Sequence, residues 1–253
     1  MSKIIAIDPG VNGGFAVIED GKPWSAPMPT LKSGPDGREE LDVAACVTFL
    51  ATECQSRETH REMGEGYYEP PTIVLEQPTP MPGFGASNFT FGWHLGFWQG
   101  LIAPHAAALL LVRPKVWQKA LGLAVPPEKR PKGEDKKAHS KRLREKKKAA
   151  KDRSIALCGR LFPQVKLVLP GSRVAHDGMA DALLIAEYGR RTMLGGGKAV
   201  SQTHASEVGH WPEGVEAEAS KPKPGVTVIH MSTDRGMKDY LEATEGPLTG
   251  DEA

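Results

Sequence analysis

Two short apolar runs in this chain each end on a carboxylate, and few folds accommodate that pattern. The run at residues 3–7 precedes Asp8, and the run at residues 72–75 precedes Glu76. Short apolar runs bounded by turn residues are typical of buried strands. A carboxylate at the end of a buried strand is costly to desolvate unless something positive meets it. The pattern therefore predicts a buried sheet whose strand ends hold a cation.

A second pair of acids opens a periodic segment late in the chain. Asp177 and Asp181 begin the sequence Asp-Gly-Met-Ala-Asp-Ala-Leu-Leu-Ile, which predicts a helix. Positions i and i+4 lie on one helix face, so both carboxylates can point the same way. Together with the two strand-end acids, this pair predicts a site that holds divalent metal.

The predicted catalytic and metal-binding residues all carry oxygen ligands, which suit Mg²⁺ or Mn²⁺ rather than zinc. Two such ions about 4 Å apart clamp the attacking and leaving oxygens of a phosphate, and a metal-activated water serves as nucleophile. An acid that bridges both metals sits centrally, which favours the innermost strand. The predicted set is Asp8, Glu76, Asp177 and Asp181.

Each acid alone also has an ordinary interpretation. An Asp-Pro-Gly after a strand, as at Asp8, is often only a turn, and Glu76 could be a surface acid at a strand end. Asp177 could be a plain helix cap, and Asp181 a solvated helix acid. Their joint occurrence in this order favours the functional interpretation.

The rest of the chain predicts alternating strands and helices. Turn residues at 9–14 and 19–22 separate three short runs, which predict an antiparallel meander. Loops are predicted at 31–40, 77–86 and 126–140. In chain order, the predicted elements are strands 3–8, 15–18 and 24–28, helix 41–57, strand 72–75, helix 88–102, strand 108–112, a short helix from Pro114, a basic helix 143–162, a weak strand 165–169 and a helix 177–191.

This order predicts an α/β fold: an RNase H-like domain with a mixed five-stranded sheet flanked by helices. At 253 residues the chain fits one domain with an appendage. We place the domain at residues 1–195. Residues 196–253 are polar and rich in Pro and Gly, which predicts a mostly flexible tail with one possible strand at 226–229.

The net charge of +1 conceals a strongly basic segment. Residues 129–153 contain thirteen bases and four acids, an excess of nine positive charges, whereas the chain after residue 200 is acidic. Such segregation predicts a polyanionic partner at one face, although a solvated helix face is the alternative. The predicted DNA-binding bases are Lys136, Lys137, Lys141, Arg142, Arg144, Lys146, Lys147 and Lys148, with Lys115 and Lys119 nearer the metals.

Aromatic and glycine residues follow Glu76. Phe84 and Phe89 in this glycine-rich stretch predict stacking on bases or wedging of a DNA junction, with core or interface packing as the alternative. Gly92, Gly96 and Gly100 line one face of the predicted helix, which would let another helix approach closely. Packing within the domain or across a homodimer is the expected use.

Five motifs together resemble the RuvC family of Holliday junction resolvases, above all its phage-encoded and chloroplast branch. The resemblance covers residues 3–192. The matching segments are Ala-Ile-Asp-Pro-Gly at 6–10, Val-Leu-Glu-Gln at 74–77, Arg-Pro-Lys-Val-Trp-Gln-Lys-Ala-Leu-Gly-Leu at 113–123, Leu-Phe-Pro at 161–163 and His-Asp-Gly-Met-Ala-Asp-Ala-Leu at 176–183.

The resemblance implies an RNase H-like fold, a homodimer and Mg²⁺- or Mn²⁺-dependent nicking of four-way DNA junctions. Asp8, Glu76 and Asp181 match the family's first, second and last acids. Many bacterial members place Asp or His three residues before the last aspartate, where this chain has Gly178. The fourth ligand is therefore open between His176 and Asp177, and the i, i+4 spacing favours Asp177.

Three other functions remain open at this point. One is an RNase H-like nuclease acting on forks, flaps or RNA–DNA hybrids, and another is a DNA-binding protein without catalysis. The third is a kinase-like ATPase of the actin-like fold, for which Gly195 to Gly197 could imitate an adenosine loop. Three scattered cysteines and the lack of about 18 consecutive apolar residues predict a cytoplasmic protein with no membrane contact.

Overall fold

A mixed β-sheet forms the centre of the computed structural model. The structure describes residues 3–33, 37–55, 71–79, 85–105, 108–125, 133, 135–194 and 226–230. The strand order across the sheet is β3-β2-β1-β6-β7-β8. The strand bounds are β1 Lys3–Asp8, β2 Gly14–Glu19, β3 Lys22–Pro27, β6 Thr72–Glu76, β7 Ala108–Val112 and β8 Val226–His230.

Strand directions follow the predicted pattern. β1, β2 and β3 form an antiparallel meander, whereas β6 lies parallel to β1, and β7 parallel to β6. The predicted α/β fold with a mixed sheet flanked by helices is thus confirmed. β8 pairs antiparallel with β7 and adds a sixth strand at the edge, at the position where the sequence allowed a possible strand. The other residues of the predicted tail lie outside the described residues.

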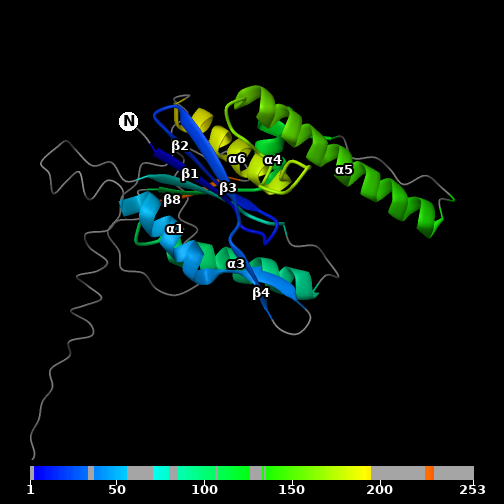
Figure 1. Ribbon diagram of the computed structural model, residues 1–253, viewed down its shortest axis with the longest axis horizontal. Coiled ribbons are helices and arrows are strands. Elements are labelled where there is room, and N and C mark those ends of the chain that lie inside the picture. The colour runs from blue at the N-terminus through cyan, green and yellow to red at the C-terminus, as the bar shows by residue number, and fades with distance from the viewer. Residues whose placement is uncertain are drawn as a thin grey trace, which may run out of the picture.

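Helices cover both faces of this sheet (Figure 1). On one face lie α1 (Val43–Gln55) and α3 (Gly85–Ile102), and on the other lie α4 (Pro114–Ala120), α5 (Lys136–Leu161) and α6 (Asp177–Leu194). Alternate residues of β1 enter the two cores: Ile5 and Ile7 pack on the α1 side, and Ile4 and Ala6 on the α6 side. Burial on both faces explains why the strands are continuously apolar.

Two loop predictions were wrong. A small hairpin of β4 (Thr30–Ser33) and β5 (Arg38–Leu41) replaces the loop predicted at 31–40, because local antiparallel pairing suffices to order these polar residues. α5 begins at Lys136 rather than near Leu143, because the Asp135 side chain accepts a hydrogen bond from the Ala138 amide and caps the helix there.

The weak strand predicted at 165–169 is also absent. In its place, the structure shows only an isolated bridge between Val168 and Ala175. This short stretch therefore acts as the connection between α5 and α6 and adds nothing to the central sheet.

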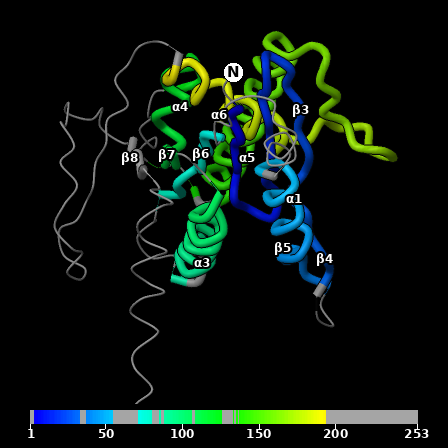
Figure 2. Tube along the Cα trace, turned by 90° about the vertical axis from the view of Figure 1, so that its left-hand side faces the viewer, coloured from blue at the N-terminus to red at the C-terminus, as the bar shows by residue number. Residues whose placement is uncertain are grey.

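α5 has a different environment along its length. Its 26 residues extend about 39 Å, and the first half projects beyond the sheet in both views (Figures 1 and 2). Only the later part packs on α6, where Ser154 and Cys158 are buried. Among the described helices, none is long and apolar enough to cross a membrane.

Candidate active site

The two strand-end acids lie side by side. β1 and β6 are parallel and in register from Ile4 opposite Thr72 to Ile7 opposite Leu75. Asp8 and Glu76 are the next residues on each strand, and the same ends of parallel neighbours meet at one edge of the sheet. The apolar runs therefore deliver both carboxylates to one place, as predicted.

A close backbone contact brings α6 to the same edge. A Cβ atom on Gly178 would collide with the carbonyl oxygen of Asn12 and the backbone of Gly13. A Cβ on Gly13 would in turn collide with the carbonyl of Asp8. Glycine at these positions lets the start of α6 lie against the turn after β1. This contact explains why no ligand side chain stands at position 178.

His176 contributes to the start of α6 as a capping residue. Its Nδ1 accepts a hydrogen bond from the Met179 amide at 3.2 Å, and its carbonyl accepts from Ala180. The ring nitrogen nearest the backbone is thereby occupied. Of the two candidates for the fourth position, Asp177 is the one that interacts with the other acids.

The four predicted acids act on one another electrostatically. Burial, followed by the charges of Glu76 and Asp181, raises the pKa of Asp8 well above its usual value, and Asp177 adds to this shift. Burial raises the pKa of Glu76 to about 7, although a hydrogen bond from Trp117 opposes the change. Burial and the charge of Asp177 raise the pKa of Asp181 to about 6, against Ser154 and Lys151. The carboxylates thus form one crowded, cation-poor cluster.

Three residues of this site were missed by the sequence analysis. Trp117 of α4 donates its Nε1–H to Glu76 Oε1 at 2.7 Å. Lys151 of α5 places its Nζ 2.6 Å from Asp177 Oδ2, and the buried Ser154 hydrogen-bonds to Asp181. The sequence offered one indication of these α5 contacts: Ser154 follows Lys151 by three residues and interrupts a run of charged residues. The contact itself depends on how α5 packs against α6.

A divalent ion fits the chemistry of this cluster. Asp181 Oδ1 is buried and accepts no hydrogen bond, which leaves a carboxylate oxygen available for a cation. All donors are hard oxygens, as Mg²⁺ and Mn²⁺ prefer. Within the described residues, no group of three or more His, Cys, Asp or Glu is already arranged to hold a metal ion. Asp177 instead contacts Lys151, so its role as a ligand stays a prediction.

The predicted DNA-binding residues occupy two helices near the cluster. Lys115 and Lys119 are exposed on α4. On α5, Arg142 and Lys146 are half-buried, and Lys136 opens the helix. The exposed bases are Lys137, Lys141, Arg144, Lys147 and Lys148. Contact between these residues and DNA stays a prediction.

The aromatic and glycine residues lie on α3. Phe89 is 77% exposed, and Trp93 nearby is 47% exposed, whereas Phe84 lies outside the described residues. Gly92, Gly96 and Gly100 are exposed, and a Cβ on any of them would meet nothing within 4 Å. No described residue therefore packs closely on the glycine face, and the homodimer stays a prediction.

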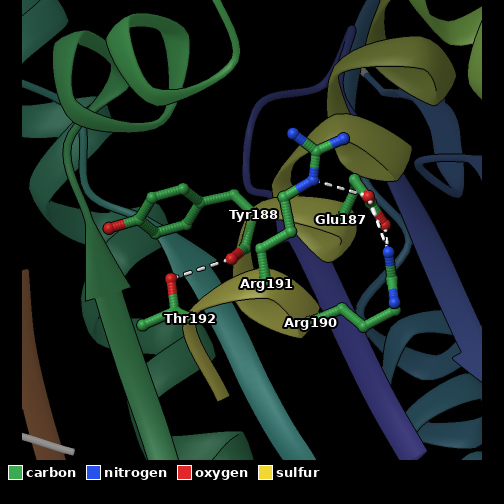
Figure 3. A network of polar contacts seen from close by, with 5 residues as sticks. All are labelled: Glu187, Tyr188, Arg190, Arg191 and Thr192. Atoms are coloured by element: carbon green, nitrogen blue, oxygen red, sulfur yellow. Dashed lines mark hydrogen bonds and ion pairs between the residues drawn. The ribbon is translucent and has the colours of Figure 1, made fainter. Parts of the chain in front are cut away.

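A second acidic region on α6 provides a contrast. Glu187 is buried, and its two oxygens accept hydrogen bonds from Arg190 and Arg191 at 2.7 to 2.9 Å (Figure 3). Burial alone would raise the pKa of Glu187, but hydrogen bonds from Arg190 and Arg191 and their charges lower it below its usual value. Beside them, the Thr192 hydroxyl donates to the Tyr188 carbonyl. This carboxylate is satisfied by its own helix.

Three comparisons set this chain beside known proteins. No protein-family model matches the chain, and no curated protein matches it. Among solved structures, RuvC of T. thermophilus in complex with a Holliday junction substrate aligns with 78% of this chain and 97% of its own. The TM-score is 0.43 and the sequence identity 15%. At this level of similarity, function has to be argued from the chain's own side chains.

Proposed function

We propose that this protein is a divalent-metal-dependent endodeoxyribonuclease that resolves four-way DNA junctions. One observation carries the proposal: Asp8, Glu76, Asp177 and Asp181 come from two strands and one helix, yet they interact as one half-buried cluster. Like charges are not gathered in a desolvated place without a cation to meet them. Within the described part of the chain, Lys151 is the cation beside the cluster, and one positive charge does not balance four carboxylates.

The side chains divide the work of such a site. Bound Mg²⁺ or Mn²⁺, with two ions per site expected, would activate water and stabilise the charge that develops on the phosphate. Asp8 on the central strand, Glu76 on the neighbouring strand and Asp177 and Asp181 on α6 would hold the metal through their carboxylate oxygens. Trp117 and Ser154 hold Glu76 and Asp181 in place through hydrogen bonds. The chain therefore needs no serine or cysteine nucleophile.

Branched DNA is the proposed substrate for three reasons. The exposed bases of α5 and the two lysines of α4 offer positive charge to phosphates beside the cluster. The segments that resemble RuvC-family resolvases contain all four acids, and Asp8, Glu76 and Asp181 match the family's first, second and last acids. The exposed glycine face of α3 offers a surface for a second subunit, and a homodimer would set two sites against two strands of a junction.

A synthetic four-way junction with Mg²⁺ or Mn²⁺ tests the proposal. The parent is expected to nick the junction, whereas Asp8→Asn and Asp181→Asn abolish nicking and keep junction binding. Full activity of Asp8→Asn would remove that residue from the mechanism.

Other substrates separate the alternatives. Faster cutting of forks, flaps or RNA–DNA hybrids would redirect the proposal to those structures. Binding of the junction without metal-dependent nicking would leave a DNA-binding protein. A thermal shift caused by ATP instead of DNA would favour the kinase-like ATPase.

A further inference from the structure

One face of α5 links the carboxylate cluster to exposed positive charge. Moving back from Cys158, the residues Ser154, Lys151, Lys147 and Arg144 follow at alternating intervals of four and three. With 3.6 residues per turn, these side chains all lie within about 60° of Lys151 around the helix. Lys137, two heptads before Lys151, falls on the same face.

The inner end of this face is part of the site. Cys158 and Ser154 are buried against α6, and Ser154 hydrogen-bonds to Asp181. One turn further out, Lys151 pairs with Asp177. The direction of the face is therefore fixed by contact with two of the four acids.

The outer end of the same face is open. Lys147, Arg144 and Lys137 are exposed, and α5 projects beyond the sheet in this stretch (Figure 1). The distance along the helix from Lys137 to Lys151 is about 21 Å. Positive side chains thus lead from the projecting end of α5 to the carboxylates.

The opposite face of α5 supplies an internal control. Arg153 and Arg160 are also exposed, and they lie about 180° to 200° around the helix from Lys151. Along the helix axis both lie nearer than Arg144 to Ser154 and Cys158, the buried residues of α5. They therefore provide the same two positive charges as Arg144 and Lys147. They lie close to the carboxylate cluster along the helix, but on the face of α5 opposite to the one that contacts it.

We propose that the face formed by Lys137, Arg144, Lys147 and Lys151 is a track that binds the phosphate backbone of one DNA strand and leads it to the carboxylate cluster. This inference rests on the proposed function and specifies the path of its substrate. Lysine and arginine ammonium and guanidinium groups recognise phosphate by charge and hydrogen bonds. Lys151 occupies the inner end, where it holds Asp177 in the absence of DNA and metal.

The test compares two double variants of the full chain that remove equal charge. Arg144→Gln with Lys147→Gln disrupts the track, and Arg153→Gln with Arg160→Gln disrupts the opposite face. Binding of a fluorescent four-way junction is measured in EDTA over a series of NaCl concentrations. The track variant is expected to bind about tenfold more weakly at 0.1 M salt, and its salt slope to fall by about 1.8, because two phosphate contacts are lost.

The control variant is expected to stay within about twofold of the parent, because charge on the wrong face makes no phosphate contact. Equally weakened junction binding in both variants, or unchanged binding in the track variant, would contradict the proposed track. Helix content and melting temperature of both variants, measured by circular dichroism, verify that each is folded.

Cleavage with Mn²⁺ separates this inference from the proposed function. If the parent nicks the junction and the two variants bind alike, the nuclease stands and the track is wrong. If the parent never nicks DNA but only the track variant loses binding, the track stands as a binding surface and the nuclease is wrong.

Discussion

α6 carries acids in two places, half-buried near its start and buried in its second half, and their surroundings differ. Glu187, in the second half of the helix, has both oxygens bonded to arginines three and four residues later. Asp181, near the start, has one buried oxygen without a hydrogen-bond partner. The charge of Asp177 raises the pKa of Asp181, and the charge of Asp181 raises the pKa values of Asp8 and Glu76. The pKa of Glu187 is lowered, whereas that of Asp181 rises to about 6.

We interpret the difference as that between a structural acid, Glu187, and an acid of the proposed site, Asp181. An i, i+4 arginine is easily placed on a helix, as Arg191 shows, so the chain has the means to neutralise a buried carboxylate. Among the residues that the structure describes, the cation found beside these acids is Lys151, on the neighbouring helix. An unsatisfied buried charge costs stability, and a site is retained at that cost when a ligand completes it.

The largest expected effect is on catalysis. Glu76→Gln removes one charge from the cluster and is expected to slow metal-dependent junction cleavage at least about 10³-fold, because several kcal/mol of transition-state stabilisation depend on the metals. Glu187→Gln, the matched change in the other region, is expected to stay within about tenfold of the parent. Single-turnover rates measure both, and equal losses would erase the distinction between the regions.

The same two variants are expected to change the free energy of unfolding in opposite directions. In metal-free buffer, Glu76→Gln stabilises the protein by about 1–3 kcal/mol, because a repelled, desolvated charge disappears while the amide oxygen still accepts from Trp117. Glu187→Gln destabilises it by about 1–3 kcal/mol, because charged hydrogen bonds are lost. Urea unfolding at pH 7.5 gives both values. A destabilised Glu76→Gln would mean that the cluster is already satisfied.

The pH dependence of stability is expected to differ between the regions. Glu76 and Asp181 bind protons more tightly when folded, so stability of the metal-free protein falls as the pH rises from about 4 to about 7. Glu187 has a lowered pKa, so its contribution is present at neutral pH and is lost as the pH falls through that lowered value. Glu76→Gln should flatten the upper range and Glu187→Gln the lower. Urea unfolding curves recorded from pH 3.5 to 8 measure this pH dependence. A parent protein that gains stability from pH 5 to 7 would contradict it.

The smallest effect is expected at Trp117. Trp117→Phe keeps the buried ring and removes the Nε1–H that orients Glu76, so Mn²⁺ affinity should fall about tenfold. Trp93→Phe, at an exposed tryptophan of α3, is the control and should leave the affinity unchanged. Equal affinities for Trp117→Phe and the parent would show that the hydrogen bond does not position the carboxylate.

Sequence reasoning recovered the parts of this site that depend on local pattern. Asp8 and Glu76 follow runs whose apolar character reflects burial on both faces, so strand identity and strand end could both be predicted. Asp177 and Asp181 sit at the start of a helix with clear periodicity. The sheet order followed from the short meander and the later parallel strands.

Long-range contacts were beyond its reach. Trp117 is 41 residues from Glu76, and Lys151 is 26 from Asp177, so neither pairing leaves a periodic trace. The departure at Gly178 looked like a missing ligand, yet it reflects the close approach of α6 to Asn12 and Gly13. The hairpin at 30–41 was missed because its strands are polar and pair only with each other.

Calorimetric titration of the metal-free protein with Mn²⁺ is the most direct measurement of whether the strand-end acids form a cation site. The parent is expected to bind Mn²⁺ with release of protons, since the raised pKa values of Glu76 and Asp181 leave part of the cluster protonated near neutral pH. Asp8→Asn should abolish that binding, and Glu187→Gln should keep it. Absence of binding in the parent, or undiminished binding in Asp8→Asn, would contradict a metal-holding role for these carboxylates.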